Sequence, residues 1–348
     1  MANEDLISRF LMKNIALTPI EKHFKDYWDA LQIPLQPLSD NLESSTYQVF
    51  EADKVKYEKY TEAIYEALID FKTQGMECCR IAILGAGRGP LVDCAIEAAS
   101  LCDMKICFEI VEKNSSAFMT LQRRLKGEWL RHHANHSYNL LFSDMRKVSK
   151  LNVNIVVSEL LGSFGDNELA PECLAYVQRH FADDRAVCIP QKYTSFVMPI
   201  SCFNVWKKIL CYEEPYVVEF GLYASQGLEV EMFEFSLDCN ELNRFREIHF
   251  PVEGIVDGIA GFFEATLYRS KSKGFDIVLS TRPCNRTANM ASWFPMYFPL
   301  KEPINSDFTL LFSRNNDGNK VWYEWAVSTT SSLSPVHNAR GCFSKMNL

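Results

Sequence analysis

The chain has 348 residues, of which 47% are hydrophobic and 23% are charged. At roughly 100 to 200 residues per domain this length favours two domains, and the ordinary composition excludes disordered, collagen-like and coiled-coil proteins. The 36 Lys and Arg residues against 44 Asp and Glu residues leave a net charge of -8. Such a chain is not expected to bind nucleic acid directly, and its charge suits a basic partner.

The apolar runs are too short to cross a membrane. The longest, Val153–Val157 and Gly258–Phe263, fall far short of the ~18 residues that a span needs. The first residues, MANEDLISRF, carry acids where a secretory signal has a basic segment, so export is not expected. The twelve cysteines include no CxxC pair, which predicts free thiols in a reducing compartment.

The first half of the chain shows a helix–strand rhythm. Prolines interrupt residues 1–46, which we interpret as an extended arm or lid. From Val55 to Phe71 apolar residues recur every three or four positions, the pattern of a helix with one buried face. The alternation that follows predicts βαβ units and a mostly parallel, doubly wound sheet. The expected strands are 80–85, 106–112, 138–144, 153–159 and 186–190, and the expected helices are 90–101 and 116–131.

The rhythm changes after Pro190 to a two-residue alternation with turn residues between the runs. This pattern predicts an antiparallel sandwich or barrel. The expected strands are 216–222, 229–237, 261–269, 275–281, 308–313 and 320–327. We therefore divide the chain into an arm (1–46), an α/β domain (47–190) and a β domain (191–348).

A glycine-rich turn is the sharpest local signal. A strand runs directly into Gly85, Gly87 and Gly89, which are followed by Pro90 and a helix. Such glycines let the backbone approach a ligand and expose helix N-terminal amides, although a tight strand-to-helix connection has the same pattern. Glu112 ends the next strand, where an acid can accept hydrogen bonds from both hydroxyls of a ribose. NAD and S-adenosylmethionine both contain that ribose, but the GxGxG spacing favours S-adenosylmethionine.

The following strand ends at Asp144 and Met145. The acid could bind the exocyclic amine of adenine, and the methionine could lie against the ring. An acid that serves only to form a turn is an equally good interpretation of this short motif.

Two glutamates, Glu159 and Glu168, follow the apolar strand at 153–157. They belong to the edge of an open α/β sheet where ligands bind, and paired carboxylates match the planar donor fork of a guanidinium. The alternative is a helix-capping loop with Asp166 or Asn167 as the cap. The spacing alone does not separate these two interpretations.

No metal site is predicted. His132, His133 and His136 could share a helix face, but no nearby Cys or acid completes a tetrahedral set, and there is no HExxH motif. A GxSxG elbow for serine hydrolysis is also absent from the sequence.

Several motifs together resemble a known family. PLQPLSDNLES, TYQVFEADKVKY, LGAGRGPLV, SELLGSFGDNELAPECL, SWFP and KVWYEWAV occur in the same order in the protein arginine methyltransferases, and most closely in the type II members that form symmetric dimethylarginine. The resemblance runs from about Tyr27 to the C-terminus. It implies a Rossmann-like domain that uses S-adenosyl-L-methionine, followed by an antiparallel β-barrel domain.

The resemblance also implies a role for individual residues. Glu159 and Glu168 would grip the substrate guanidinium, Phe50 would favour the symmetric product, and Trp293 would close over the arginine. The implied cofactor-binding residues are Tyr47, Lys56, Tyr57, Gly85, Gly87, Glu112, Asp144 and Met145. The implied substrate-binding residues are Gln32, Leu35, Phe50, Ser292 and Trp293.

The partners that the resemblance implies are arginine-containing proteins, namely histone tails and Gly/Arg-rich RNA-associated proteins. It also implies a homodimer and a place in the cytoplasm and nucleus. The relatives carry an N-terminal TIM-type barrel on which a WD-repeat partner docks, and without that barrel this partner is not expected here. The alternative to an enzyme is a catalytically silent scaffold that binds S-adenosylmethionine.

Overall fold

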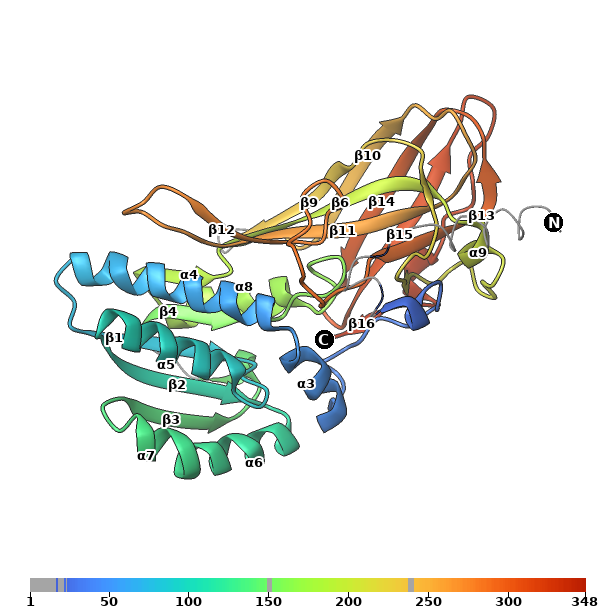
Figure 1. The fold of residues 1–348 in the computed structure, drawn as a ribbon. Coiled ribbons are helices and arrows are strands. Elements are labelled where there is room, and N and C mark those ends of the chain that lie inside the picture. Colours follow the sequence, from blue (N-terminus) through green and yellow to red (C-terminus); the bar gives the residue numbers. More distant parts are fainter. Residues whose placement is uncertain (1–16, 18–21, 23, 149–151, 237–240) are drawn as a thin grey trace.

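The structure is a computed structural model that describes residues 17, 22, 24–148, 152–236 and 241–348. It has two regions, an α/β layer and a β region beside it (Figure 1). The first part of the arm predicted over residues 1–46 lies largely outside the described residues. Within the described part, no helix is long and apolar enough to cross a bilayer.

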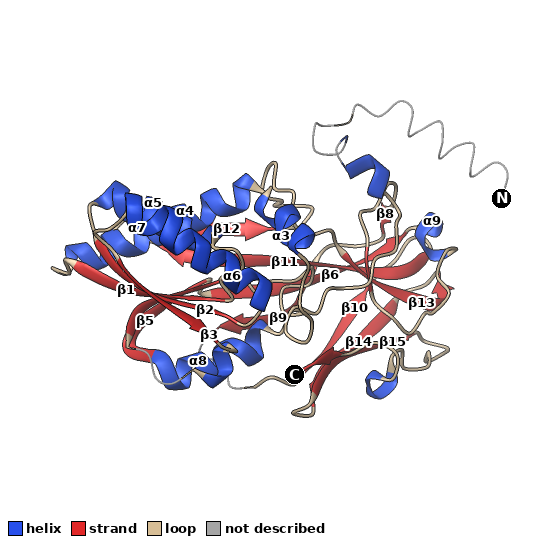
Figure 2. Ribbon diagram, turned by 90° about the horizontal axis from the view of Figure 1, so that it is seen from below, coloured by secondary structure: helices blue, strands red, loops and turns tan. Residues whose placement is uncertain are grey.

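The first region is built on a five-stranded parallel sheet of order β3-β2-β1-β4-β5. Its strands are β1 (Cys78–Leu84), β2 (Lys105–Glu112), β3 (Ser137–Phe142), β4 (Val153–Ser158) and β5 (Ala182–Ile189). Its helices are α3 (Ser44–Glu51), α4 (Lys54–Thr73), α5 (Pro90–Cys102), α6 (Ser115–Arg124), α7 (Leu130–His132) and α8 (Ala170–Phe181). Figure 2 shows α4 and α5 on one face of the sheet and α8 on the other. The predicted doubly wound sheet is confirmed.

Two helical details differ from the predictions. The helix expected at 116–131 is interrupted, because a π-helical turn over Leu125–Trp129 separates α6 from α7. Helix α3 was not predicted, and it continues across the boundary placed between residues 46 and 47. Its eight residues include Ser44, Ser45, Thr46 and Val49, which are weak helix formers.

The second region consists of two separate antiparallel sheets, so the predicted antiparallel architecture is confirmed. One sheet contains β6 (Lys192–Ser201), β7 (Tyr216–Val217), β8 (Ala224–Ser225), β9 (Val230–Ser236), β11 (Val256–Arg269), β12 (Asp276–Ser280) and β13 (Met296–Ile304). The other contains β10 (Arg244–Phe250), β14 (Phe308–Asn316), β15 (Lys320–Ser328) and β16 (Met346–Asn347). Helix α9 (Phe203–Trp206) follows β6.

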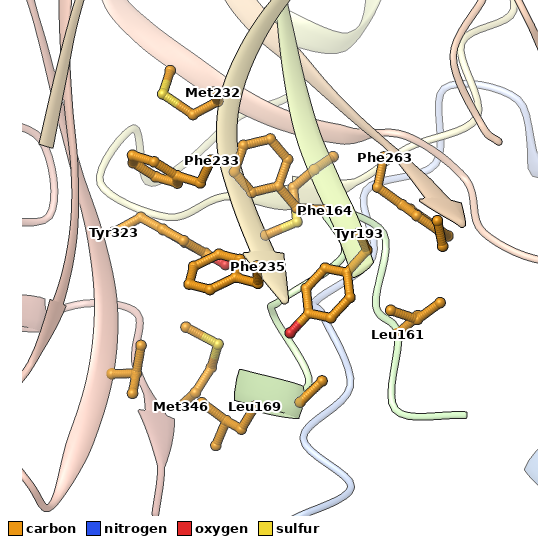
Figure 3. Close-up of a cluster of buried hydrophobic side chains, with 14 of the residues drawn as sticks. Leu161, Phe164, Leu169, Tyr193, Met232, Phe233, Phe235, Phe263, Tyr323 and Met346 are labelled. Atoms are coloured by element: carbon orange, nitrogen blue, oxygen red, sulfur yellow. The ribbon is translucent and has the colours of Figure 1, made fainter. Parts of the chain in front are cut away.

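The two regions pack against each other at more than one place. The end of the long β11–β12 hairpin packs on α4, where the hydroxyl of Tyr268 donates to Asp70 at 2.9 Å and that of Ser270 donates to Glu66 at 2.8 Å. The loop after β4 enters the hydrophobic core of the second region instead, and Figure 3 shows Phe164 from this loop among side chains of the two sheets. Burial of one such ring contributes about 1.5–3 kcal/mol, so the position of the loop depends on the second region.

Candidate active site

A cleft lies at the carboxyl ends of the parallel strands, where the strand order reverses between β1 and β4. This edge is where ligands bind in open α/β sheets. The cleft contains about 990 Å³ of space free of protein atoms, part of which is open to solvent. The predicted site residues that line it are Tyr47, Phe50, Tyr57, Gly85, Gly87, Glu112, Asp144, Met145, Glu159 and Glu168.

The glycine-rich turn is held against Glu112. Gly87 N donates to Glu112 Oε2 at 2.7 Å, and Asn114 N donates to Oε1 at 2.6 Å. Gly87 has a φ of +56°, and a Cβ there would lie 3.1 Å from the Tyr47 ring, so the close approach requires glycine. Burial raises the pKa of Glu112, and these amide bonds offset part of the effect. Each carboxylate oxygen keeps a lone pair for a further donor such as a ribose hydroxyl.

Asp144 forms a turn and also lines the cleft, and its contact with adenine stays a prediction. Its carboxylate accepts from Arg146 N at 2.8 Å and pairs with the Arg146 guanidinium at 2.7 Å, so it does form a turn. It also lines the cleft together with Met145, whose methyl group lies beside Gly85. Burial raises the pKa of Asp144, but the hydrogen bonds and charge of Arg146 outweigh burial and hold it below its ordinary value.

Helix α3 covers one side of the cleft. It is held there by contacts of residues that the sequence analysis did not single out. Arg88, within the glycine-rich turn, donates to both carboxylate oxygens of Glu51 at 3.0 and 2.6 Å and to Ser44 Oγ at 2.9 Å. Asn114 Nδ2 donates to Leu42 O at 2.9 Å. These contacts hold the arm over the cleft. They join segments far apart in sequence, so no local sequence pattern predicts them.

The two glutamates lie at the ends of a loop between β4 and α8, which we call the carboxylate loop (Glu159–Glu168). Gly162 and Gly165 exchange backbone hydrogen bonds, with N···O distances of 3.2 and 2.8 Å, so the loop folds back on itself. Gly165 has a φ of +83°, a left-handed conformation that glycine adopts without strain. This fold brings both carboxylates to the lining of the same cleft.

The alternative of a helix-capping loop does not describe this segment. The carboxylate of Asp166 accepts from Arg314 and from Tyr323, both in the second region. The side-chain oxygen of Asn167 accepts from Phe164 N at 2.7 Å, within the loop. Both side chains therefore hold the loop itself.

The two glutamates differ in their electrostatic surroundings. Lys56 Nζ lies 3.1 Å from Glu159 Oε2. Burial raises the pKa of Glu168 well above its ordinary value, the charge of Glu159 raises it further, and the charge of Lys56 lowers it in part. The site therefore presents one carboxylate paired with a cation and one that holds a proton more strongly than an exposed glutamate does.

The Lys56 ammonium is enclosed by aromatic rings. It lies 5.4, 5.0 and 5.0 Å from the ring centroids of Phe50, Tyr57 and Trp293, and the residue is 1% exposed. These distances are within the ~6 Å range of a cation–π contact. Trp293 is itself fixed by a hydrogen bond from its indole nitrogen to Leu161 O at 2.6 Å. The rings and the carboxylate loop thus form a position that holds a cation.

Asp53 organises this position and was also missed in the sequence. One oxygen caps α4 by accepting from Lys56 N at 3.2 Å, and the other accepts from Ala291 N at 3.0 Å and Ser292 N at 2.7 Å. The loop before Trp293 is therefore attached to the start of α4. An Asp immediately before the first residue of a helix is a visible capping signal, but the second bond of Asp53 links residues 238 positions apart.

Of the predicted site residues, Lys56 and four substrate-binding residues are not part of the cleft lining; Lys56 and Trp293 meet beside it. Gln32 pairs through its backbone with Val217, Leu35 is 42% exposed, and Ser292 is held by Asp53 through its backbone nitrogen. Their contacts with a peptide stay a prediction. Among the described residues, no three His, Cys, Asp or Glu side chains gather as a metal site would, and His136 accepts from Ile106 N at 3.1 Å.

The parallel sheet, with its glycine-rich turn and with Glu112 at the end of the next strand, is followed by antiparallel sheets. This arrangement is a Rossmann-like methyltransferase fold with a β domain. Two solved structures share it at 14% identity. A Trypanosoma brucei PRMT1 enzyme–prozyme complex with AdoHcy has a TM-score of 0.65, covering 88% of this chain and 99% of that one. Arabidopsis thaliana protein arginine methyltransferase 10 has a TM-score of 0.61, covering 84% and 95%.

The chain belongs to the PRMT5 arginine methyltransferase family. Residues 19–189 match the model of the PRMT5 arginine-N-methyltransferase domain, and residues 192–346 match that of the PRMT5 oligomerisation domain. The chain is 39% identical to protein arginine N-methyltransferase 5 of Xenopus laevis and 38% identical to protein arginine N-methyltransferase skb1 of Schizosaccharomyces pombe. Each match covers 92% of this chain and 53% or 56% of the relative, so the chain spans about half the length of these curated relatives.

Proposed function

We propose that this chain is an S-adenosylmethionine-dependent protein arginine methyltransferase that forms monomethylarginine and symmetric dimethylarginine. The observation that carries the proposal is the convergence of Glu159, Phe50 and Trp293 on one position, which the Lys56 ammonium occupies, with Glu168 lining the cleft beside Glu159. Two carboxylates and flanking rings are the partners that a guanidinium needs. This position adjoins the cleft at the strand ends.

The residues of the cleft fit S-adenosylmethionine. Glu112 would accept from the ribose hydroxyls, Asp144 would accept from the adenine amine beside Met145, and the backbone of the glycine-rich turn would meet the amino-acid end. The bound group supplies an electrophilic methyl on a sulfonium. Glu112, Glu159 and Glu168 line the same cleft, which supports a cofactor bound next to the acceptor position.

The chain's own residues would then position the acceptor. Glu159 and Glu168 hold the guanidinium by its N–H groups, so that one terminal nitrogen is presented about 3 Å from the methyl group. Arginine has a pKa above 12 and is a poor nucleophile, so a proton must leave the nitrogen as methylation proceeds. Glu168, whose pKa is raised by burial and by Glu159, is suited to receive that proton.

The proposed substrates are histone tails and Gly/Arg-rich proteins, whose basic character suits a chain with a net charge of -8. We also propose a homodimer, which the match of residues 192–346 to an oligomerisation domain supports. Gln32, Leu35 and Ser292 are proposed to contact the peptide on either side of the target arginine.

Methyl transfer to an Arg/Gly-rich peptide tests the reaction. Wild type, Glu159→Gln and Glu168→Gln are compared, with products resolved by mass spectrometry. We expect each variant to lose about 10²- to 10⁴-fold in kcat and to keep its affinity for S-adenosylhomocysteine within about twofold. The exposed Glu302 provides the control variant Glu302→Gln. Absence of turnover in wild type, despite cofactor binding, would reject the enzyme in favour of a silent scaffold.

A second experiment tests the symmetric product. Phe50 borders the cation position, and Phe50→Met opens space on one side of the guanidinium plane. We expect the dimethylated product to shift toward asymmetric dimethylarginine, measured as the ratio of the two isomers. Val49→Met, on the neighbouring 72% exposed residue, is the control, and an unchanged ratio in Phe50→Met would contradict the role of Phe50.

A further inference from the structure

We propose that Tyr323 and Arg314, in the second region, are positioning residues that set the geometry of the glutamate pair through Asp166. The inference rests on the proposed function for its catalytic consequence. Asp166 lies inside the carboxylate loop, two residues before Glu168. Its carboxylate is one of the connections between that loop and the second region.

The connection is fully buried. Asp166 and Arg314 are 0% exposed and Tyr323 is 2% exposed. Arg314 Nε and the Tyr323 hydroxyl, the latter at 2.7 Å, both donate to Asp166 Oδ2. Arg314 on β14 and Tyr323 on β15 are cross-strand partners, so the ladder between these strands fixes the two donors relative to each other.

Arg314 also holds the chain beyond Glu168. Its NH1 and NH2 groups donate to the two carboxylate oxygens of Glu172, in the first turn of α8, at 2.8 and 2.9 Å. Glu168 therefore lies between two acids that are bound to one guanidinium. A planar, two-pronged contact of this kind restricts orientation as well as distance.

The other end of the loop is held by the same region. The Phe164 ring lies 5.2 Å from that of Phe298 and 5.6 Å from that of Tyr323, both in edge-to-face geometry. Gly261 on β11 leaves the space for it, because a Cβ there would lie 2.7 Å from the Phe164 ring. Trp293 adds the hydrogen bond to Leu161 O. The loop thus takes its shape from β11, β13, β14 and β15.

The variant that tests this inference must separate positioning of the loop from a general loss of stability. Removing Arg314 would leave two buried acids unpaired, which destabilises a fold strongly whatever its function. Tyr323→Phe is the sharper variant, because it deletes one hydroxyl and keeps the ring and the Arg314–Asp166 pair.

The molecule offers a matched control. Tyr268 is 1% exposed, and its hydroxyl donates to Asp70 at 2.9 Å, across the same two regions but at the hairpin on α4. Tyr268→Phe therefore removes the same group from a similar buried contact. It does not touch the carboxylate loop.

The experiment compares wild type, Tyr323→Phe and Tyr268→Phe as full chains. We expect Tyr323→Phe to lower kcat/KM for an Arg/Gly-rich peptide about tenfold and to leave the dissociation constant of S-adenosylhomocysteine within about twofold. Hydrogen exchange of the amides of residues 161–168 should become about tenfold faster. Tyr268→Phe should change neither kcat/KM nor the hydrogen exchange of residues 161–168, even if its melting temperature falls as far as that of Tyr323→Phe.

The outcomes separate the inference from the proposed function. Equal losses in both variants, or loop exchange unchanged in Tyr323→Phe, would overturn the positioning role. If wild type shows no methyl transfer, the proposed function fails, and the exchange of the loop amides still decides whether Tyr323 positions the loop.

Discussion

The two halves of the cleft are built in different ways. In the cofactor half, which we propose binds S-adenosylmethionine, the amides of Gly87 and Asn114 both donate to Glu112, just after the adjacent strands β1 and β2. In the acceptor half, which we propose binds the arginine, Lys56 donates to Glu159 from 103 positions away, and Trp293 donates to Leu161 from 132 positions away. The first half therefore depends on local backbone geometry, and the second depends on how two regions pack. Substitutions in one half should therefore affect the binding of one ligand and not of the other.

The largest effect on one half alone is expected from Glu112→Gln, which should weaken cofactor binding. The amide replaces one acceptor oxygen with an N–H₂ group facing the Gly87 or Asn114 amide, and it removes the charge that ribose hydroxyls would meet. Loss of charged hydrogen bonds predicts a rise of about 100-fold in the dissociation constant of S-adenosylhomocysteine, measured by calorimetry. Glu109→Gln, on the same strand, is the control. Comparable weakening by both variants would place the loss in strand β2 and not in the site.

A smaller effect in the opposite half is expected from Asp53→Asn. The asparagine loses one of the oxygens that accept from Lys56 N, Ala291 N and Ser292 N, so the loop before Trp293 should detach from α4. We expect the KM for the peptide to rise about tenfold with cofactor affinity unchanged. Steady-state kinetics with each ligand varied in turn provides the measurement. A parallel change in both constants would show that the halves are not independent, and the exposed Asp103→Asn is the control.

The fold was largely predictable where a strand is one continuous apolar run. The parallel strands have that character, since buried sheets covered on both faces need no polar alternation. Strands β6 and β13 were missed because Pro199, Pro299 and Pro303 interrupt their patterns, and β10 because of its charges. The strand expected at 216–222 forms only Tyr216–Val217.

The site was predictable to the extent that its residues follow strand ends. Glu112, Asp144 and Glu159 could be found in this way because strand ends meet at one sheet edge. Asp53, Arg88 and Arg314 could not, because their partners lie 37 to 239 residues away. The occupation of the ring-lined position by Lys56 was also unforeseen, since a lysine at the start of an amphipathic helix is ordinarily solvated.

The smallest expected effect concerns stability and follows from the charge of the acceptor half. Burial and Glu159 raise the pKa of Glu168 in the folded chain, so the folded state binds that proton more tightly than the unfolded state. Stability therefore falls as pH rises from the unfolded pKa through the folded one, and the whole cost is present above it. Glu168→Gln, which cannot ionise, should melt about 2–4 °C higher than wild type at neutral pH. The difference should vanish below about pH 4, where both chains are uncharged at this position.

Thermal melts across this pH range, with Glu302→Gln as the control, provide the measurement. A variant less stable than wild type at neutral pH would show that the Glu168 carboxylate is needed for folding as well as for acceptor binding.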